Sequence, residues 1–99
     1  MERKIKFTAH GERWFDRVNG NTYHSVSITR LKDGETIKCP MTYGYDDHYR
    51  QTALEAMVKA KWLPGKYRPN GTYYERENNY PIEWSVNDGL KRDCIANGE

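Results

Sequence analysis

The chain has 99 residues, 36% hydrophobic and 30% charged, with a net charge of +2, which fits a single domain spanning residues 1–99. Its three Trp, eight Tyr and two Phe exclude a typical disordered segment, because disordered chains are poor in aromatic residues. The near-balance of charge argues against an acidic mimic of DNA, and no apolar run is long enough to span a membrane.

Three antiparallel strands in a meander are predicted for the first half of the chain. Apolar and polar residues alternate over residues 5–18, with an interruption at Gly11. This pattern predicts one long strand with a bulge or bend near that glycine. Asn19-Gly20-Asn21 favours a hairpin turn, and residues 22–31 form the return strand. A second turn at residues 32–35 then leads into a third strand.

A long helix is predicted from about Asp47 to Leu63, where apolar residues recur at three- and four-residue spacing. Asp46 or Asp47 can cap its first turn, and Pro64-Gly65 ends it. We expect its broad apolar face to pack across the meander.

Residues 64–81 predict a long irregular loop rich in proline and tyrosine, and such loops in compact domains are often functional. After it, two more strands are predicted. Apolar and polar residues alternate over residues 82–86, a turn follows at residues 87–89, and residues 90–95 can pair back. The predicted fold class is therefore α+β: an antiparallel sheet of about five strands, in the order β-β-β-α-β-β, with one long helix packed on one face.

Asp16 and His24 are the candidate catalytic pair. Counting outward from the hairpin turn places Asp16 opposite His24, and a carboxylate beside a histidine can serve as a base or a metal site. The same pair is also an ordinary structural contact, and the nucleophile nearest to His24 in this hairpin, Ser25, lies on the opposite face. We therefore expect a structural role, no catalytic residue and no enzyme activity.

No metal site and no cofactor are predicted. No two of the histidines and cysteines lie closer than nine positions, whereas structural zinc sites use closely spaced pairs of ligands. The chain also has no glycine-rich phosphate loop. Cys39 and Cys94 could form one disulfide, but residues 1–13 lack the apolar core of a signal peptide, so we expect buried thiols and a cytoplasmic location.

A basic, aromatic segment between Glu55 and Glu75 is the candidate binding surface. Tyr, Trp and Arg are enriched at protein interfaces, which favours a protein partner. Basic groups also neutralise phosphates, and aromatic faces stack on bases, so the alternative is a single-stranded nucleic-acid-binding domain that uses residues 59–76. The predicted contact residues are Lys61, Lys66, Tyr67, Arg68, Tyr73, Tyr74 and Arg76.

The stretch RWFDRVNGNTYHSVSI, residues 13–28, resembles a segment that recurs in short accessory proteins of phages and prophages. The resemblance covers roughly residues 5–28 and carries no catalytic residue. It implies a compact protein that binds host machinery, of the anti-CRISPR or anti-defence type. We therefore expect a non-catalytic protein-binding module that inhibits a host protein or ribonucleoprotein complex, such as a CRISPR–Cas complex. Its oligomeric state is open, although exposed edge strands would allow a dimer.

Overall fold

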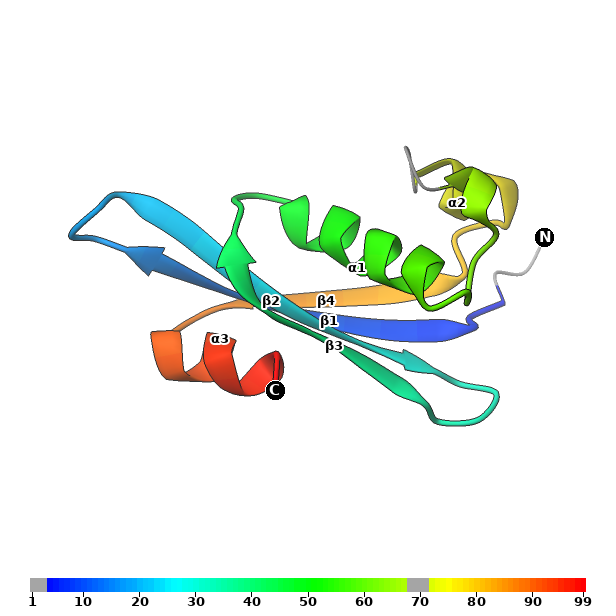
Figure 1. The fold of residues 1–99 in the computed structure, drawn as a ribbon, viewed down its shortest axis with the longest axis horizontal. Coiled ribbons are helices and arrows are strands. Elements are labelled where there is room, and N and C mark those ends of the chain that lie inside the picture. Colours follow the sequence, from blue (N-terminus) through cyan, green and yellow to red (C-terminus); the bar gives the residue numbers. More distant parts are fainter. Residues whose placement is uncertain (1–3, 68–71) are drawn as a thin grey trace.

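The computed structural model describes residues 4–67 and 72–99 and shows one mixed sheet with the strand order β3-β2-β1-β4 (Figure 1). The strands are β1 (Phe7–Asp16), β2 (Asn21–Arg30), β3 (Thr36–Tyr43) and β4 (Ile82–Asp88). The helices are α1 (His48–Lys59), the short 3₁₀ helix η1 (Gly65–Tyr67), α2 (Thr72–Glu77) and α3 (Lys91–Asn97). Within these residues, none of the helices has the length and apolar character that a membrane span requires.

The α+β class and the antiparallel meander of β1, β2 and β3 are confirmed. The prediction of five antiparallel strands and one long helix is wrong in three places. β4 runs parallel to β1, residues 91–97 form α3 instead of a fifth strand, and α2 lies in the segment expected to be irregular.

The parallel direction of β4 follows from the path of α1. β3 ends beside the β1–β2 hairpin, and α1 carries the chain back along the sheet to the end where β1 begins (Figure 1). A strand that starts there and pairs with β1 must run in the same direction, as in other crossovers through a helix. Phe7 accordingly lies beside Ile82, and Arg13 lies beside Asp88.

The core lies between the sheet and α1. Four α1 side chains are buried against both central strands and β4: Tyr49, Ala53, Leu54 and Met57. The sheet contributes Phe7, Ala9, Val26, Ile28 and Ile82.

Gly11 is required by close packing of α1 on β1, and it does not mark a bulge. The pairing of β1 with β2 runs without interruption from Phe7 to Asp16, and the only register shift in these pairings lies between β2 and β3, at residues 24–26. A Cβ atom on Gly11 would lie 2.7 Å from Cδ2 of Tyr49. The glycine therefore makes room for the Tyr49 ring.

The ends of α1 differ from the prediction. Asp47 occupies the N-cap position, but its side chain makes no capping hydrogen bond. The helix ends at Lys59, before Pro64-Gly65, because Lys61 adopts a left-handed conformation with φ of 64°. The Trp62 N–H donates to the Met57 carbonyl at 2.9 Å, and the Lys61 N–H donates to the Val58 carbonyl at 3.0 Å. This is a Schellman motif with lysine where glycine is usual.

α3 covers part of the opposite face of the sheet (Figure 1). The Ser25 hydroxyl donates to the Cys94 carbonyl, and the Asn97 amide donates to the His10 carbonyl at 3.0 Å. Cys39 and Cys94 are both buried and free, as expected, and burial raises the pKa of each thiol.

Candidate functional site

His24 is a core residue. Its side chain is fully buried, Nδ1 donates to the Gly44 carbonyl at 3.1 Å, and Nε2 accepts from the Thr52 hydroxyl at 2.8 Å. Both ring nitrogens therefore have a hydrogen-bond partner within the core. Burial lowers the pKa of His24, and the ring of His48, 5.4 Å away, lowers it further.

The predicted pairing of Asp16 with His24 is wrong. His24 lies opposite Arg13, whereas Asp16 lies opposite Asn21. The cause is the turn, which contains four residues, Arg17 to Gly20, instead of three. Asp16 closes this turn by accepting hydrogen bonds from the backbone of Val18 and from the side chain and backbone of Asn19, which lowers its pKa.

Two of the predicted contact residues lie in the core. Tyr67 is 7% exposed and Tyr74 is 6% exposed, and their rings pack edge to face with centroids 5.3 Å apart. The Tyr67 hydroxyl donates to Glu77 at 2.5 Å. These rings hold η1 against α2 and are not available as a contact surface.

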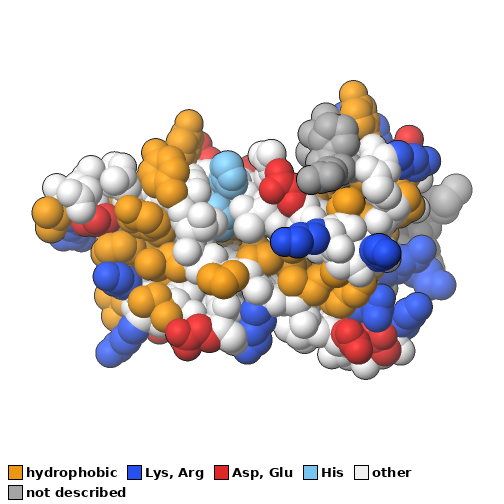
Figure 2. All heavy atoms as spheres, in the orientation of Figure 1, with side chains coloured by type: hydrophobic (Ala, Val, Ile, Leu, Met, Phe, Trp, Pro, Cys, Tyr) orange, Lys and Arg blue, Asp and Glu red, His pale blue; other side chains and the backbone are white. Residues whose placement is uncertain are grey.

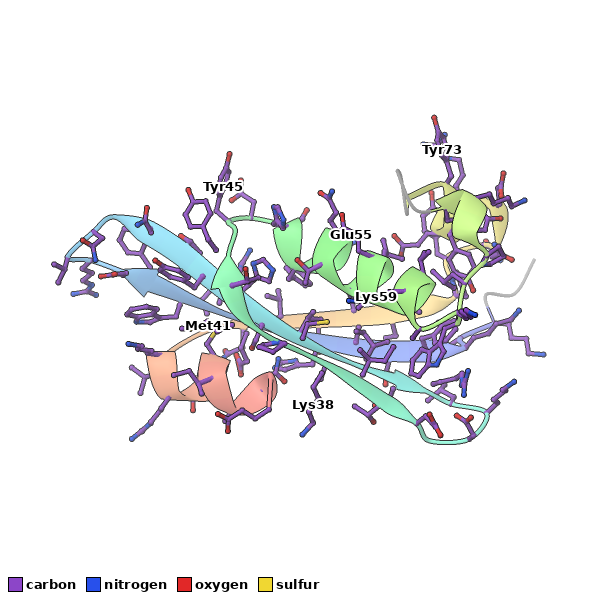
Figure 3. The ribbon with its side chains drawn as sticks, viewed as in Figure 1. Lys38, Met41, Tyr45, Glu55, Lys59 and Tyr73 are labelled. Carbon is purple, nitrogen blue, oxygen red and sulfur yellow. The ribbon has the colours of Figure 1, made fainter. Side chains whose placement is uncertain are left out.

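Four other predicted contact residues are exposed on the same elements as that tyrosine pair or shortly before them. Lys61 and Lys66 are exposed at the end of α1 and on η1, and Tyr73 and Arg76 are exposed on α2. The Lys66 ammonium lies 5.0 Å above the Tyr67 ring, and the Arg76 guanidinium lies 5.8 Å from the Tyr73 ring. Tyr73 projects away from the body of the molecule (Figure 3). Arg68 lies outside the described residues.

The other end of the molecule carries an exposed apolar surface that the sequence analysis missed. We call it the hairpin-end surface, because it surrounds the β1–β2 hairpin, where apolar side chains gather in Figure 2. Its members come from β1, the hairpin turn, the end of β3 and the segment before α3. They are Phe15, Val18, Tyr43, Tyr45 and Leu90, with exposed fractions of 54%, 92%, 56%, 61% and 54%.

A hollow of about 690 Å³ lies within the hairpin-end surface, lined by Phe15, Val18, Tyr45 and Leu90 among others. β4 pairs with β1 only as far as Arg13, so in the described chain no strand flanks Trp14, Phe15 and Asp16 on that side. The hollow therefore adjoins a short open edge of β1.

The wall of the hollow is held rigidly by Arg13. Its guanidinium donates to both carboxylate oxygens of Asp88, at 2.6 and 3.0 Å, and to the Asp46 carbonyl at 2.9 Å. The bond to Asp88 raises the pKa of Arg13. One side chain thus joins β1, the end of β4 and the segment before α1, and bidentate pairs of this kind fix geometry well.

An aromatic row supports the hairpin end on the α3 side of the sheet. Trp14 stacks on Tyr23 with ring centroids 5.6 Å apart, and Tyr23 meets Tyr43 edge to face at 6.0 Å. The Lys91 ammonium lies 5.3 Å from the Trp14 ring. The consecutive pair Trp14-Phe15 was the signal available in the sequence: the two side chains of a strand dipeptide point to opposite faces, so one helix cannot bury both.

A polar network links β1 and β4 beside α3. The Ser85 hydroxyl donates to His10 Nδ1 at 2.7 Å, and His10 Nε2 lies 3.3 Å from a Glu12 carboxylate oxygen. A serine beside an imidazole can be activated, but acyl transfer also needs donors that stabilise an oxyanion. The adjoining hollow is lined by Glu83, whose charge opposes an oxyanion. The network is therefore best explained as a contact between strands.

No known protein-family model matches the chain, and no curated protein or solved structure matches it. Residues 4–67 and 72–99 also contain no cluster of three His, Cys, Asp or Glu side chains suited to hold a metal ion. The features that bear on function are those of the molecular surface.

Proposed function

We propose that the chain is a protein-binding module that contacts its partner through the hairpin-end surface. The observation that carries this proposal is a hollow lined by four apolar side chains that are each more than half exposed: Phe15, Val18, Tyr45 and Leu90. Contiguous apolar patches are uncommon on monomeric soluble proteins and typically mark interaction sites.

The energetics favour a protein over a small polar ligand. Each exposed aromatic or aliphatic side chain gains about 25 cal/mol per Å² of apolar surface that a partner covers. Tyrosine and phenylalanine are also enriched in the buried centres of interfaces. Arg13 and Asp88 prepare the hollow in advance, which reduces the ordering cost of binding.

The shape of the site suits an extended segment of the partner. The open edge of β1 beyond Arg13 offers backbone groups for pairing, and the hollow beside it accepts one large apolar side chain. Recognition by strand addition combines these two features.

The resemblance of residues 13–28 to phage and prophage accessory proteins supplies a biological setting for the proposal. The partner would be a bacterial protein or ribonucleoprotein of a defence complex, such as a CRISPR–Cas complex, in the host cytoplasm. The chain would inhibit this complex by occupying a binding site, without catalysis.

The experiment is affinity capture from a bacterial host lysate, followed by identification of the captured protein and measurement of its Kd with purified components. Leu90→Ser combined with Val18→Ser should weaken binding at least tenfold. Leu31→Ser is the matched control, because Leu31 is 49% exposed but lies at the opposite end of the sheet. Capture of the same protein with equal affinity by the double variant would refute the hairpin-end surface as the contact site.

A further inference from the structure

The end of the molecule opposite the hairpin carries a group of cations. It is built by the start of β1, the β2–β3 turn, the end of α1, and η1, and Figure 2 shows Lys and Arg side chains gathered there. The lysines of this basic end are Lys6, Lys32, Lys59, Lys61 and Lys66. Since the whole chain carries a net charge of only +2, these five lysines leave the rest of the molecule with a net negative charge.

Ion pairs do not neutralise the lysines of the basic end. In the described part of the chain, the ion pairs are His10 with Glu12, Arg13 with Asp88 and Arg30 with Asp33, and no lysine takes part. The ammonium groups are therefore open to an external anion, although that of Lys66 also lies over the Tyr67 ring.

Lys61 occupies a backbone position that favours glycine. Its φ of 64° closes the Schellman motif of α1, and a left-handed conformation is unfavourable for a residue with a Cβ atom. Residues held in unfavourable backbone conformations are enriched at functional sites. The chain therefore carries a cation at a point where glycine would be more stable.

Flat groups that can stack on bases accompany the lysines. The Arg30 guanidinium lies 4.6 Å from the Trp62 ring, which itself stacks on Phe7 at 6.0 Å. On α2, the Tyr73 ring is 53% exposed and has Arg76 beside it. Stacking on aromatic rings and guanidinium groups is how proteins bind unpaired bases without reading their sequence.

We propose that the basic end binds single-stranded nucleic acid, with Lys61 and its neighbouring lysines on the phosphates and Tyr73 on a base. This function goes beyond protein binding, because it uses the opposite end of the molecule and does not depend on the hairpin-end surface. Exposed stacking groups distinguish a single strand from duplex DNA or a lipid headgroup, neither of which offers an accessible base face.

The first test measures the affinity of the purified chain for a labelled single-stranded oligonucleotide over a salt series. Contacts from about four lysines predict a slope of log K against log salt near −3, since each contact to a single strand contributes about −0.7. Absence of binding at 50 mM salt would overturn the proposal, and so would equal or tighter binding to anionic lipid vesicles.

The second test uses Lys61→Gly, for which folding and binding should change in opposite directions. The variant removes one cation and should lower oligonucleotide affinity about fivefold at 0.1 M salt, while its fold becomes more stable. Lys38→Ala is the matched control, because Lys38 carries the same charge on the face of the sheet opposite α1 (Figure 3). Unchanged affinity in Lys61→Gly, or an equal loss in Lys38→Ala, would overturn the proposal.

Discussion

The basic end buries two tyrosines beside the exposed Tyr73, whereas no aromatic ring of the hairpin-end surface is buried. At the basic end, Tyr67 and Tyr74 are buried between η1 and α2, and cations lie outside them. At the hairpin end, Phe15, Tyr43 and Tyr45 are more than half exposed. Tyr45 and Tyr73 project from opposite ends of the molecule (Figure 3).

The difference follows from the lengths of the elements. α1 has 12 residues and spans about 18 Å, whereas the 10 residues of β1 span about 33 Å. One helix therefore cannot cover the whole face of the sheet. η1 and α2 extend the cover beyond the end of α1 at the basic end, while the hairpin projects beyond its beginning (Figure 1).

The largest expected difference between the two ends is in the free energy of unfolding that is lost when a tyrosine is truncated. Tyr74→Ala should lower the free energy of unfolding by about 3–5 kcal/mol, because it removes a buried ring that packs on Tyr67. Tyr45→Ala should change it by no more than about 0.5 kcal/mol, because Tyr45 is 61% exposed. Urea unfolding measures both, and similar losses at the two ends would show that the comparison is wrong.

The sequence was sufficient to predict the meander and α1, because both show a local periodicity of apolar residues. These apolar residues then form the core. It did not predict α3, because the seven residues of that helix carry no clear helical stripe and are held mainly by long-range contacts such as that between Ser25 and Cys94. The direction of β4 was missed for a similar reason: alternation identifies a strand but says nothing of its partner.

The site was harder to predict than the fold. Whether a side chain is exposed depends on where the helices that cover the sheet end. Tyr67 and Tyr73 are both tyrosines in a polar segment, yet one is core and the other is surface. The register of the hairpin was also misjudged, since the side chain of Asp16 closes a four-residue turn and displaces the predicted partner of His24. Such a choice of turn depends on hydrogen bonds that periodicity does not reveal.

Acidification should loosen the junction between α1 and the hairpin end. His24 is buried, and its pKa is lowered below the ordinary value of 6.5, so the unfolded chain binds more protons than the folded chain below that pH. The stability contributed by neutral His24 is therefore fully present above about pH 6.5 and is lost as the pH falls toward the lowered pKa.

The measurement is the free energy of unfolding of the native chain and of His24→Gln between pH 7.5 and pH 5. The amide of glutamine can bond Gly44 and Thr52 but does not titrate, so the variant should lose less stability on acidification. The ring of His48 lies 5.4 Å from that of His24, so His48→Gln is the necessary second control. If the free energy of unfolding fell equally with pH in the native chain and in His24→Gln, His24 would not be the source of the acid sensitivity.

A smaller effect is expected from Lys61→Gly at the basic end. Glycine adopts the left-handed conformation without steric cost, so the variant should gain about 0.5–1 kcal/mol in the free energy of unfolding. Lys61→Ala is the informative control: it also removes the charge but keeps the strained Cβ atom, and it should not gain this stability. Equal stability of the two variants would mean that the backbone at Lys61 is not strained.

The smallest expected effect concerns salt at the hairpin end, and it separates the two surfaces most directly. The contacts proposed there are apolar, and the Arg13–Asp88 pair lies within the chain, so raising salt from 0.05 to 0.5 M should change the partner's Kd by less than about threefold. Oligonucleotide binding at the basic end should fall several hundredfold over the same range. Isothermal titration calorimetry at both salt concentrations measures the Kd of the protein partner and of the oligonucleotide on the same preparation of the chain. A partner whose affinity fell as steeply as that of the oligonucleotide would have to bind the lysines of the basic end, so the hairpin-end surface would then lack the function proposed for it.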